Sequence, residues 1–288
     1  MATRDVSIGV TVDGYAVEGG FDVEGAPATS FLAAQSLGRV RASVRSPGTF
    51  EHLDDLVAAA SALGCKEVRL TLEWARLERR PGERDEGALD RYLAALGAAK
   101  AASMRTVVVL CDAAWPSWLG QEPWLSAWAP QRFAAHAAWV GQRAGELVDA
   151  VVTFRAPNVA AQAGWRTATR PPFRTGAAAD EVAALDGMLV AHQRAVVALA
   201  SELPAATCAL LLGVAARYED GALWRDLAAG ITDPVALGAR RDRFGALRRQ
   251  HGVRPPRPAW RRRPTDVTSL RSTPGWASLP PWECWLAG

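Results

Sequence analysis

Short apolar runs alternate with longer stretches of helical periodicity through most of this chain. Residues 107–110 and 209–212 are apolar at every position, which is typical of parallel strands that are buried on both faces. Runs of this kind predict strands, whereas an alternating polar and apolar pattern would indicate a sheet with one face in water. We expect five strands, at residues 7–12, 67–72, 106–110, 150–154 and 208–213.

Between these runs, apolar residues recur at the three- and four-residue spacing of amphipathic helices. This periodicity predicts helices at residues 50–63, 87–102, 131–147 and 180–202. Thr49 precedes the first of these helices and Asp180 is the first residue of the last one. Both have side chains that suit the N-cap position. Strands that alternate with helices favour βα units around a parallel sheet, so the predicted class is α/β.

The pattern weakens after about residue 218. Residues 240–264 carry ten arginines against one acid, Asp242, and prolines are dense from residue 255 onward. Proline at this density excludes helices and central strands, so we expect an exposed loop here that proteases cut first. Weaker strand signals follow at residues 265–270 and 275–279. We treat residues 1–288 as one domain with an Arg/Pro-rich loop at about 240–264.

Composition excludes several classes of protein. The chain has 288 residues, 49% of them hydrophobic, and a net charge of +3, which gives no sign of a nucleic-acid surface; the arginine stretch lacks interleaved aromatic residues. The N-terminus has no apolar signal region and no run is long enough for a bilayer, so we expect a cytoplasmic protein without a membrane partner. Four scattered cysteines indicate reduced thiols. Histidine spacing predicts no metal site, and we expect no cofactor.

Four segments resemble glycoside hydrolase family 1, the family of the β-glucosidases, over about residues 8–200. The first runs from Gly9 through Tyr15 to Glu18 and Gly19, and the second from Arg69 through Trp74 to Arg76. The third places Asp112 four residues before Pro116, and the fourth runs from Thr153 to Pro157. These segments occur in the order that the family shows. The resemblance implies a (β/α)8 barrel, shortened and incomplete in its C-terminal third, but fold alone does not establish an activity.

The positions that carry the family's chemistry hold different residues here. The family has Asn and Glu before the proline of the fourth segment, and this chain has Arg155 and Ala156. Ala16 and Asp112 stand where the family has the Gln and His that contact sugar. No Thr-Glu-Asn-Gly segment, which carries the family's nucleophile, occurs. Because glycoside hydrolysis of this type needs two carboxyl groups, the sequence predicts that this route is lost.

Other carboxylates could have taken over, because functional residues in such barrels lie at the C-terminal ends of strands. By that rule the candidate acids are Glu18, Glu73, Asp112 and Glu283. Asp112 is the best placed of them, directly after a strand. The alternative is that it pairs with Arg155 or Arg69 only to satisfy a buried charge. Because Asp112 and Arg155 follow consecutive strands, we expect them to be neighbours and to form an ion pair. A guanidinium at this place could also clamp a carboxylate or phosphate.

Tryptophan could supply a sugar-binding wall, since four tryptophans follow the third expected strand. Core packing is the alternative reading of Trp115 and its neighbours. The candidate substrate-binding residues are therefore Glu18, Arg69, Asp112, Trp115, Arg155 and Glu283.

Together these observations favour a non-hydrolytic, glycosidase-like protein that binds a sugar or an anionic small molecule, or serves as a protein partner. The alternative is an enzyme with a remodelled barrel mouth that uses Asp112 with Arg155 or Arg69, or a residual glycoside hydrolase.

Overall fold

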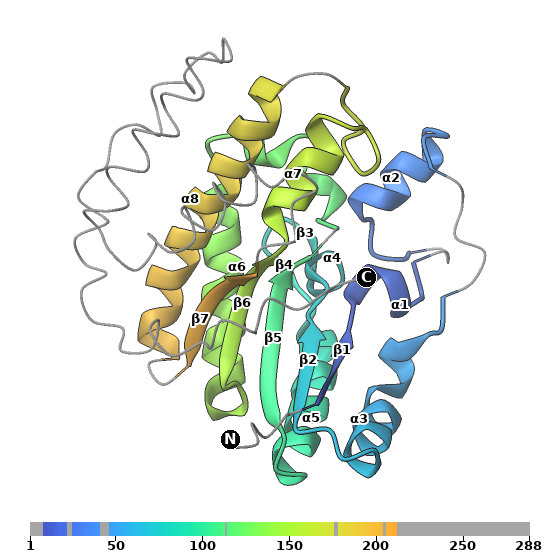
Figure 1. Cartoon of the computed structure of the whole chain (residues 1–288), viewed down its shortest axis with the longest axis vertical. Helices are drawn as coiled ribbons and strands as arrows, with labels where there is room; N and C mark the ends of the chain where they lie inside the picture. Colours follow the sequence, from blue (N-terminus) through green and yellow to red (C-terminus); the bar gives the residue numbers. More distant parts are fainter. Residues whose placement is uncertain are drawn as a thin grey trace, which may run out of the picture.

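A parallel sheet of five strands forms the centre of the molecule (Figure 1). The computed structural model describes residues 8–21, 25–40, 46–112, 114–175, 178–203 and 206–211. The strand order is β1-β2-β5-β6-β7, and each neighbouring pair is parallel. The five expected strands are thus confirmed, as β1 (Gly9–Val12), β2 (Glu67–Thr71), β5 (Arg105–Cys111), β6 (Ala150–Arg155) and β7 (Thr207–Leu211).

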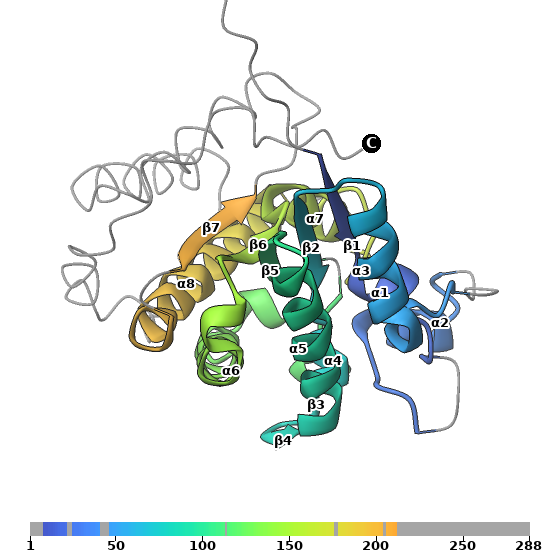
Figure 2. The same cartoon turned by 90° about the horizontal axis from the view of Figure 1, so that it is seen from below.

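Four helices cover one face of this sheet (Figure 2). They are α3 (Leu53–Ala62), α5 (Glu86–Ala101), α6 (Ala129–Ala144) and α8 (Ala178–Glu202), and all four were expected from the apolar periodicity. The main core lies between them and the sheet, with Val68, Leu70 and Val108 facing the helices. On the other face, a second apolar cluster consists of Val107, Val109, Ala150 and Val152. Both faces are apolar, as a parallel sheet requires.

The helix starts differ from the expected caps at two places. Thr49 opens a short 3-10 helix, Thr49–His52, whose N-cap is Gly48, and the Thr49 hydroxyl has no hydrogen-bond partner among the described residues. Asp180 lies inside the first turn of α8 and so is not its N-cap residue. Its negative charge there interacts favourably with the positive N-terminal end of the helix dipole. Both N-cap predictions are wrong. The cap of α5 is Asp85, whose carboxylate accepts a hydrogen bond from the N–H of Ala88 at 2.9 Å.

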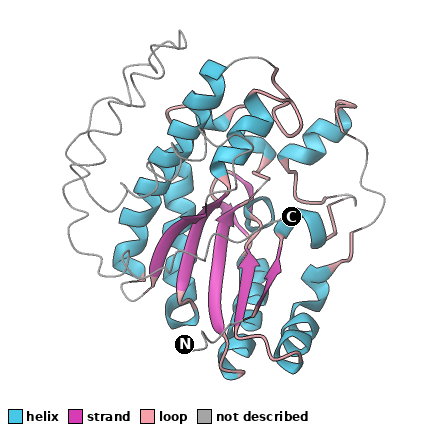
Figure 3. Cartoon of the chain, viewed as in Figure 1, coloured by secondary structure: helices cyan, strands magenta, loops and turns pink. Residues whose placement is uncertain are grey.

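Several short elements escaped the sequence pattern because each spans too few residues to show periodicity. They are among the helices, strands and turns that Figure 3 colours by secondary structure. They are α1 (Gly14–Val17), α2 (Ser30–Ser36), α4 (Trp74–Leu77), α7 (Pro157–Trp165), the hairpin β3 (Glu78–Arg80) with β4 (Glu83–Arg84), and the 3-10 turns Ser117–Leu119, Pro123–Leu125 and Gly145–Leu147.

The expectation that no run is long enough for a bilayer is wrong for residues 179–202 of α8, which pass by length and composition alone, but half of the most apolar stretch is buried inside the protein. The helix packs against α6 and α7, with Ala184, Leu185 and Met188 buried. This burial accounts for its apolar composition. The loop expected at 240–264 and the strand signals after it lie outside the described residues.

Candidate functional site at the strand ends

Three charged residues meet at the C-terminal ends of three strands. Asp13 follows β1, Asp112 follows β5, and Arg155 is the last residue of β6. The Arg155 Nε donates to Asp112 Oδ1 at 2.9 Å, and its Nη2 donates to Asp13 Oδ2 at 3.1 Å. A further contact of 2.9 Å joins Arg155 Nη1 to Asp13 Oδ1. The predicted ion pair between Asp112 and Arg155 is confirmed, with Asp13 as a second partner. We call these three residues the mouth cluster.

The mouth cluster is partly exposed. The side chains of Asp13, Asp112 and Arg155 keep 32%, 13% and 25% of their surface in solvent. Burial raises the pKa of Asp112, although Arg155 and the more distant, exposed Arg170 act in the opposite direction. Burial alone would lower the pKa of Arg155, but Asp112 and Asp13 reverse that effect and raise it. All three guanidinium nitrogens therefore already contact carboxylate oxygens, so Arg155 is poorly placed to pair with an anionic ligand as well.

Ala156 lies beside this cluster in an unusual backbone conformation. Its φ and ψ are 51° and 50°, which is the left-handed region, and it is the N-cap of α7. This region costs an L-residue about 1–2 kcal/mol. Strained backbone of this kind is often kept at functional sites. The side chain here is a methyl group, which offers no proton for a leaving oxygen.

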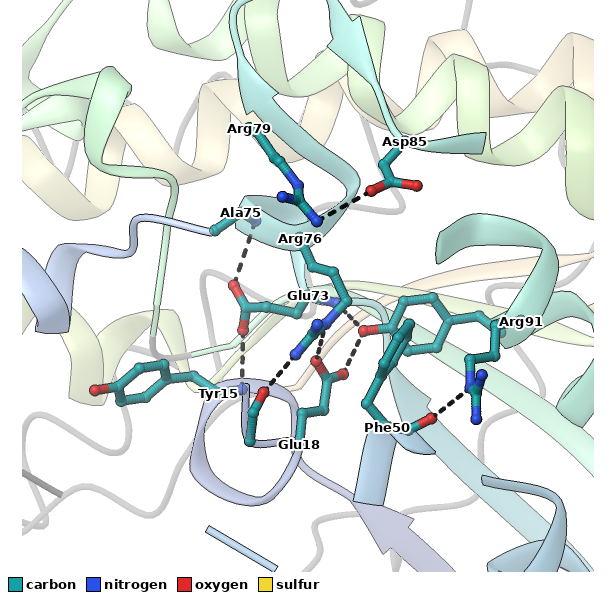
Figure 4. A network of polar contacts seen from close by, with 11 residues as sticks. Tyr15, Glu18, Phe50, Glu73, Ala75, Arg76, Arg79, Asp85 and Arg91 are labelled. Atoms are coloured by element: carbon teal, nitrogen blue, oxygen red, sulfur yellow. Dashed lines mark hydrogen bonds and ion pairs between the residues drawn. The ribbon is translucent and has the colours of Figure 1, made fainter. Parts of the chain in front are cut away.

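Glu18 is a structural anchor in this geometry (Figure 4). It is 1% exposed, and its Oε2 accepts a hydrogen bond from Arg76 Nε at 2.9 Å. Its Oε1 accepts from the Tyr92 hydroxyl, and Arg76 also donates to the carbonyl of Gly19 at 2.6 Å. Both carboxylate oxygens are thus engaged inside the protein. This arrangement ties the end of α1 to α4 and α5 and favours a structural role over ligand binding.

Glu73 is a second buried carboxyl, 4% exposed, at the N-cap of α4. Its Oε2 accepts from the N–H of Tyr15 at 2.9 Å, and its Oε1 accepts from the N–H of Ala75 at 3.4 Å. Burial raises its pKa to about 8, and the negative charges of Glu18 and Asp112 add to the shift. Glu73 therefore keeps its proton at neutral pH.

The remaining predicted site residues lie in other surroundings. Arg69 is 6% exposed and contacts Glu67, at 3.4 Å, toward the start of β2, and Glu67 also pairs with Arg105 at 2.7 Å. Trp115 is 4% exposed; its indole N–H donates to the Gly120 carbonyl at 3.0 Å and its ring stacks on Trp165. Core packing thus describes Trp115 better than a sugar-binding wall. Glu283 lies outside the described residues.

Sequence reasoning missed Asp13. The signal was present, because Asp13 directly follows the first expected strand just as Asp112 follows the third. The same rule of strand ends that selected Asp112 selects Asp13 as well. The side chain of Asp13 does not cap α1; it points to Arg155 instead.

Solved structures with this architecture include glycosidases. An enzyme from Alicyclobacillus herbarius, described as AHE enzyme, matches with a TM-score of 0.75 and 21% identity over 94% of this chain and 64% of its own. β-Glucosidase 2 from Trichoderma reesei, in complex with Tris, has a TM-score of 0.67 and 22% identity, covering 81% of this chain and 55% of that one. The β-glucosidase from Thermotoga maritima, in complex with a methoxycarbonyl-substituted glucoimidazole, has a TM-score of 0.70 and 17% identity, covering 81% and 56%.

At these identities the likeness establishes the fold, that of (β/α)8 barrels, and the chain spans between half and about two thirds of these structures' length. Among curated protein sequences, none matches the chain. The model of one family, glycosyl hydrolase family 1, matches residues 4–227, which is most of the chain and includes the mouth cluster and the buried carboxyls. The chain therefore belongs to glycosyl hydrolase family 1.

Proposed function

We propose that this chain is a family 1 member that has lost two-carboxylate hydrolysis and binds a sugar-like small molecule at the mouth cluster. The observation that carries the proposal is the pair of residues at the end of β6. Ala156 stands where the resemblance places the family's acid/base, and Arg155, just before it, is held between Asp112 and Asp13. A methyl group cannot protonate a leaving oxygen, and general acid catalysis typically contributes about 10²–10⁴-fold.

A neutral, hydroxyl-rich ligand suits the mouth cluster better than an anion. The guanidinium of Arg155 is already paired with two carboxylates, whereas carboxylate oxygens of Asp13 and Asp112 can accept further hydrogen bonds from hydroxyl groups. The β-glucosidase from Thermotoga maritima binds a glucoimidazole, which supports a sugar-like ligand.

A role as a partner subunit is the other non-hydrolytic reading. The free thiols Cys65, Cys111 and Cys208 support a reducing, cytoplasmic setting.

Titration with methyl β-glucoside and with a glucoimidazole, followed by calorimetry or NMR, tests this proposal. We expect binding in the wild type and a loss of at least tenfold in affinity in Arg155→Met, because an unpaired mouth no longer orients Asp13 and Asp112. Arg143→Met is the matched control, since Arg143 joins an ion pair with Glu86 away from the strand ends. Absence of binding, or equal affinity in Arg155→Met and Arg143→Met, contradicts the proposal.

One observation favours a second candidate, an enzyme with a remodelled mouth. Burial raises the pKa of Asp112 while Asp13 lies on the other side of the same guanidinium. Two carboxyls in different environments are what general acid and base catalysis needs. This candidate predicts turnover of a glycoside that Asp112→Asn abolishes, which the non-hydrolytic proposal does not.

A further inference from the structure

Asp13 lies just beyond the part of β1 that the sheet holds in place. The last paired residue of β1 is Val12, opposite Leu70 of β2. The Asp13 side chain makes no capping bond to α1, and its carboxylate points to Arg155 across the mouth. The backbone on the far side of Asp13 is fixed two residues later, where the N–H of Tyr15 donates to Glu73 Oε2 at 2.9 Å.

We propose that Glu73 is a positioning residue that holds Asp13 opposite Arg155. Its carboxyl connects the start of α1 to α4, because it accepts N–H groups from Tyr15 and Ala75 (Figure 4). Glu18 and Arg76 anchor the other end of α1. The two buried carboxyls thereby fix both ends of the segment that begins with Asp13. This role rests on the proposed site, but its test needs no ligand.

The contact between Glu73 and this segment is too close for a side chain at Gly14. A Cβ at Gly14 would lie 2.8 Å from Glu73 Oε2 and 3.0 Å from Thr71 Cγ2. Distances this short force atoms to shift. Gly14 therefore lets the backbone approach the Glu73 carboxyl, and a methyl group there would push the segment off it.

Glu73 acts in this role as a neutral group. Its pKa of about 8 reflects burial first and the charges of Glu18 and Asp112 second. The buried groups around it include the Tyr92 hydroxyl, which accepts from the Glu73 N–H at 3.3 Å, and the Cys111 thiol, whose own pKa burial raises. Glutamine has one accepting oxygen, which can keep the 2.9 Å bond from the Tyr15 N–H, although its NH2 group cannot accept the longer bond from the Ala75 N–H. Glutamine should therefore preserve the position of Asp13, and leucine, which accepts no hydrogen bond, should not.

A double-mutant cycle between Asp13→Asn and Arg155→Met, followed by urea unfolding at pH 7, measures the coupling between the two side chains. This coupling depends on whether Asp13 is held opposite Arg155. We expect a coupling of about tenfold in the unfolding constant in the wild-type background. The coupling should persist with Glu73→Gln and fall to about twofold or less with Glu73→Leu. Glu78→Leu is the matched control, because Glu78 is a buried carboxyl that accepts from Trp74 Nε1 and the Gly82 N–H and has no hydrogen bond or ion pair with the Asp13 segment among the described residues.

Equal coupling in the Glu73→Leu, Glu78→Leu and wild-type backgrounds overturns the positioning role. If Glu73→Leu does not fold, Gly14→Ala provides the same test from the other side of the contact while the carboxyl stays in place. Loss of coupling in Gly14→Ala supports the role, and retained coupling refutes it. A chain that shows these losses of coupling but binds no sugar refutes the proposed function and leaves this inference standing.

Discussion

At the scale of single residues, the proton on Glu73 links stability to pH. Its pKa is about 8 in the folded protein against an ordinary value of 4.5, so the folded state holds a proton that the unfolded state releases. The contribution of Glu73 to stability is then greatest below pH 4.5 and falls as the pH rises toward 8. Across this pH range the free energy of unfolding should fall by up to about 5 kcal/mol because of Glu73, and we predict that Glu73→Gln lacks this fall. Urea unfolding at pH 5 and 8 checks it, and equal pH slopes in both proteins would refute it.

Arg155 should matter more to stability than Asp112. Burial already disfavours the charged form of Asp112, so Asp112→Asn removes a costly charge and leaves Arg155 paired with Asp13. Arg155→Met leaves two carboxylates facing each other. We predict a change below about 1 kcal/mol for Asp112→Asn and a loss of about 2 kcal/mol for Arg155→Met, discounted for the exposure of the cluster. Chemical unfolding at pH 7 measures both, and a larger loss in Asp112→Asn would contradict this view.

The left-handed backbone of Ala156 gives a further prediction. Glycine adopts this conformation without strain, and the gain exceeds the added entropy of the unfolded chain. We predict that Ala156→Gly stabilises the protein by about 0.5–1 kcal/mol. The matched control is Ala160→Gly inside α7, which should destabilise by a similar amount. Destabilisation at both positions would show that Ala156 carries no strain.

The ion pair of Asp112 and Arg155 followed from the sequence because both residues end neighbouring parallel strands, where side chains meet. The burial of Glu73 and Glu18 did not follow, since it depends on α1 and α4, each four residues long. Elements so short have no periodicity to detect. The packing of Trp115 on Trp165 of α7 did not follow from the sequence either.

At the scale of elements, α6 and α8 pack together and each buries a histidine. His136 of α6 stacks on Trp74, and neither of its ring nitrogens has a hydrogen-bond partner among the described residues. His192 of α8 lies 2.6 Å from the Thr153 hydroxyl. Burial lowers the pKa of both histidines to about 3. Neither can take up a proton in the folded state without cost.

These histidines should make the helical layer sensitive to acid. A lowered pKa means stability that is present above pH 6.5 and is lost as the pH falls toward 3. Between pH 7 and 4.5, His136 should cost the wild type about 3 kcal/mol of unfolding free energy. We predict that His136→Phe does not lose this amount, because the aromatic packing on Trp74 stays while the titrating group disappears. Thermal unfolding at both values checks this. A variant as acid-sensitive as the wild type would show that His136 is not the cause.

The larger elements were predictable and their ends were not. Strands such as β5 and helices such as α5 have long apolar or periodic patterns, which fix their place along the chain. A cap depends on the backbone just before the helix. The 3-10 turn at Thr49–His52 moved the true start of α3 away from the expected capping residue.

At the scale of the whole molecule, the sequence predicted the α/β class and the parallel sheet because fully apolar runs alternate with amphipathic helices. The strand order needed the structure, since β2 pairs with β1 on one side and with β5 on the other, and the β3–β4 hairpin is excluded from the main sheet. Family membership now explains the architecture. In such a fold, activity depends on a few side chains at the strand ends.

Hydrolysis of 4-nitrophenyl β-glucoside by the purified chain, between pH 5 and 8, tests the central claim most directly. An aryl leaving group needs little protonation, so this substrate is the most lenient toward the loss of the acid that we propose at Ala156. The account predicts no turnover above the uncatalysed rate, and no difference between the wild type and Asp112→Asn. Turnover well above that rate, lost in Asp112→Asn, would contradict the account and establish a catalytic mouth.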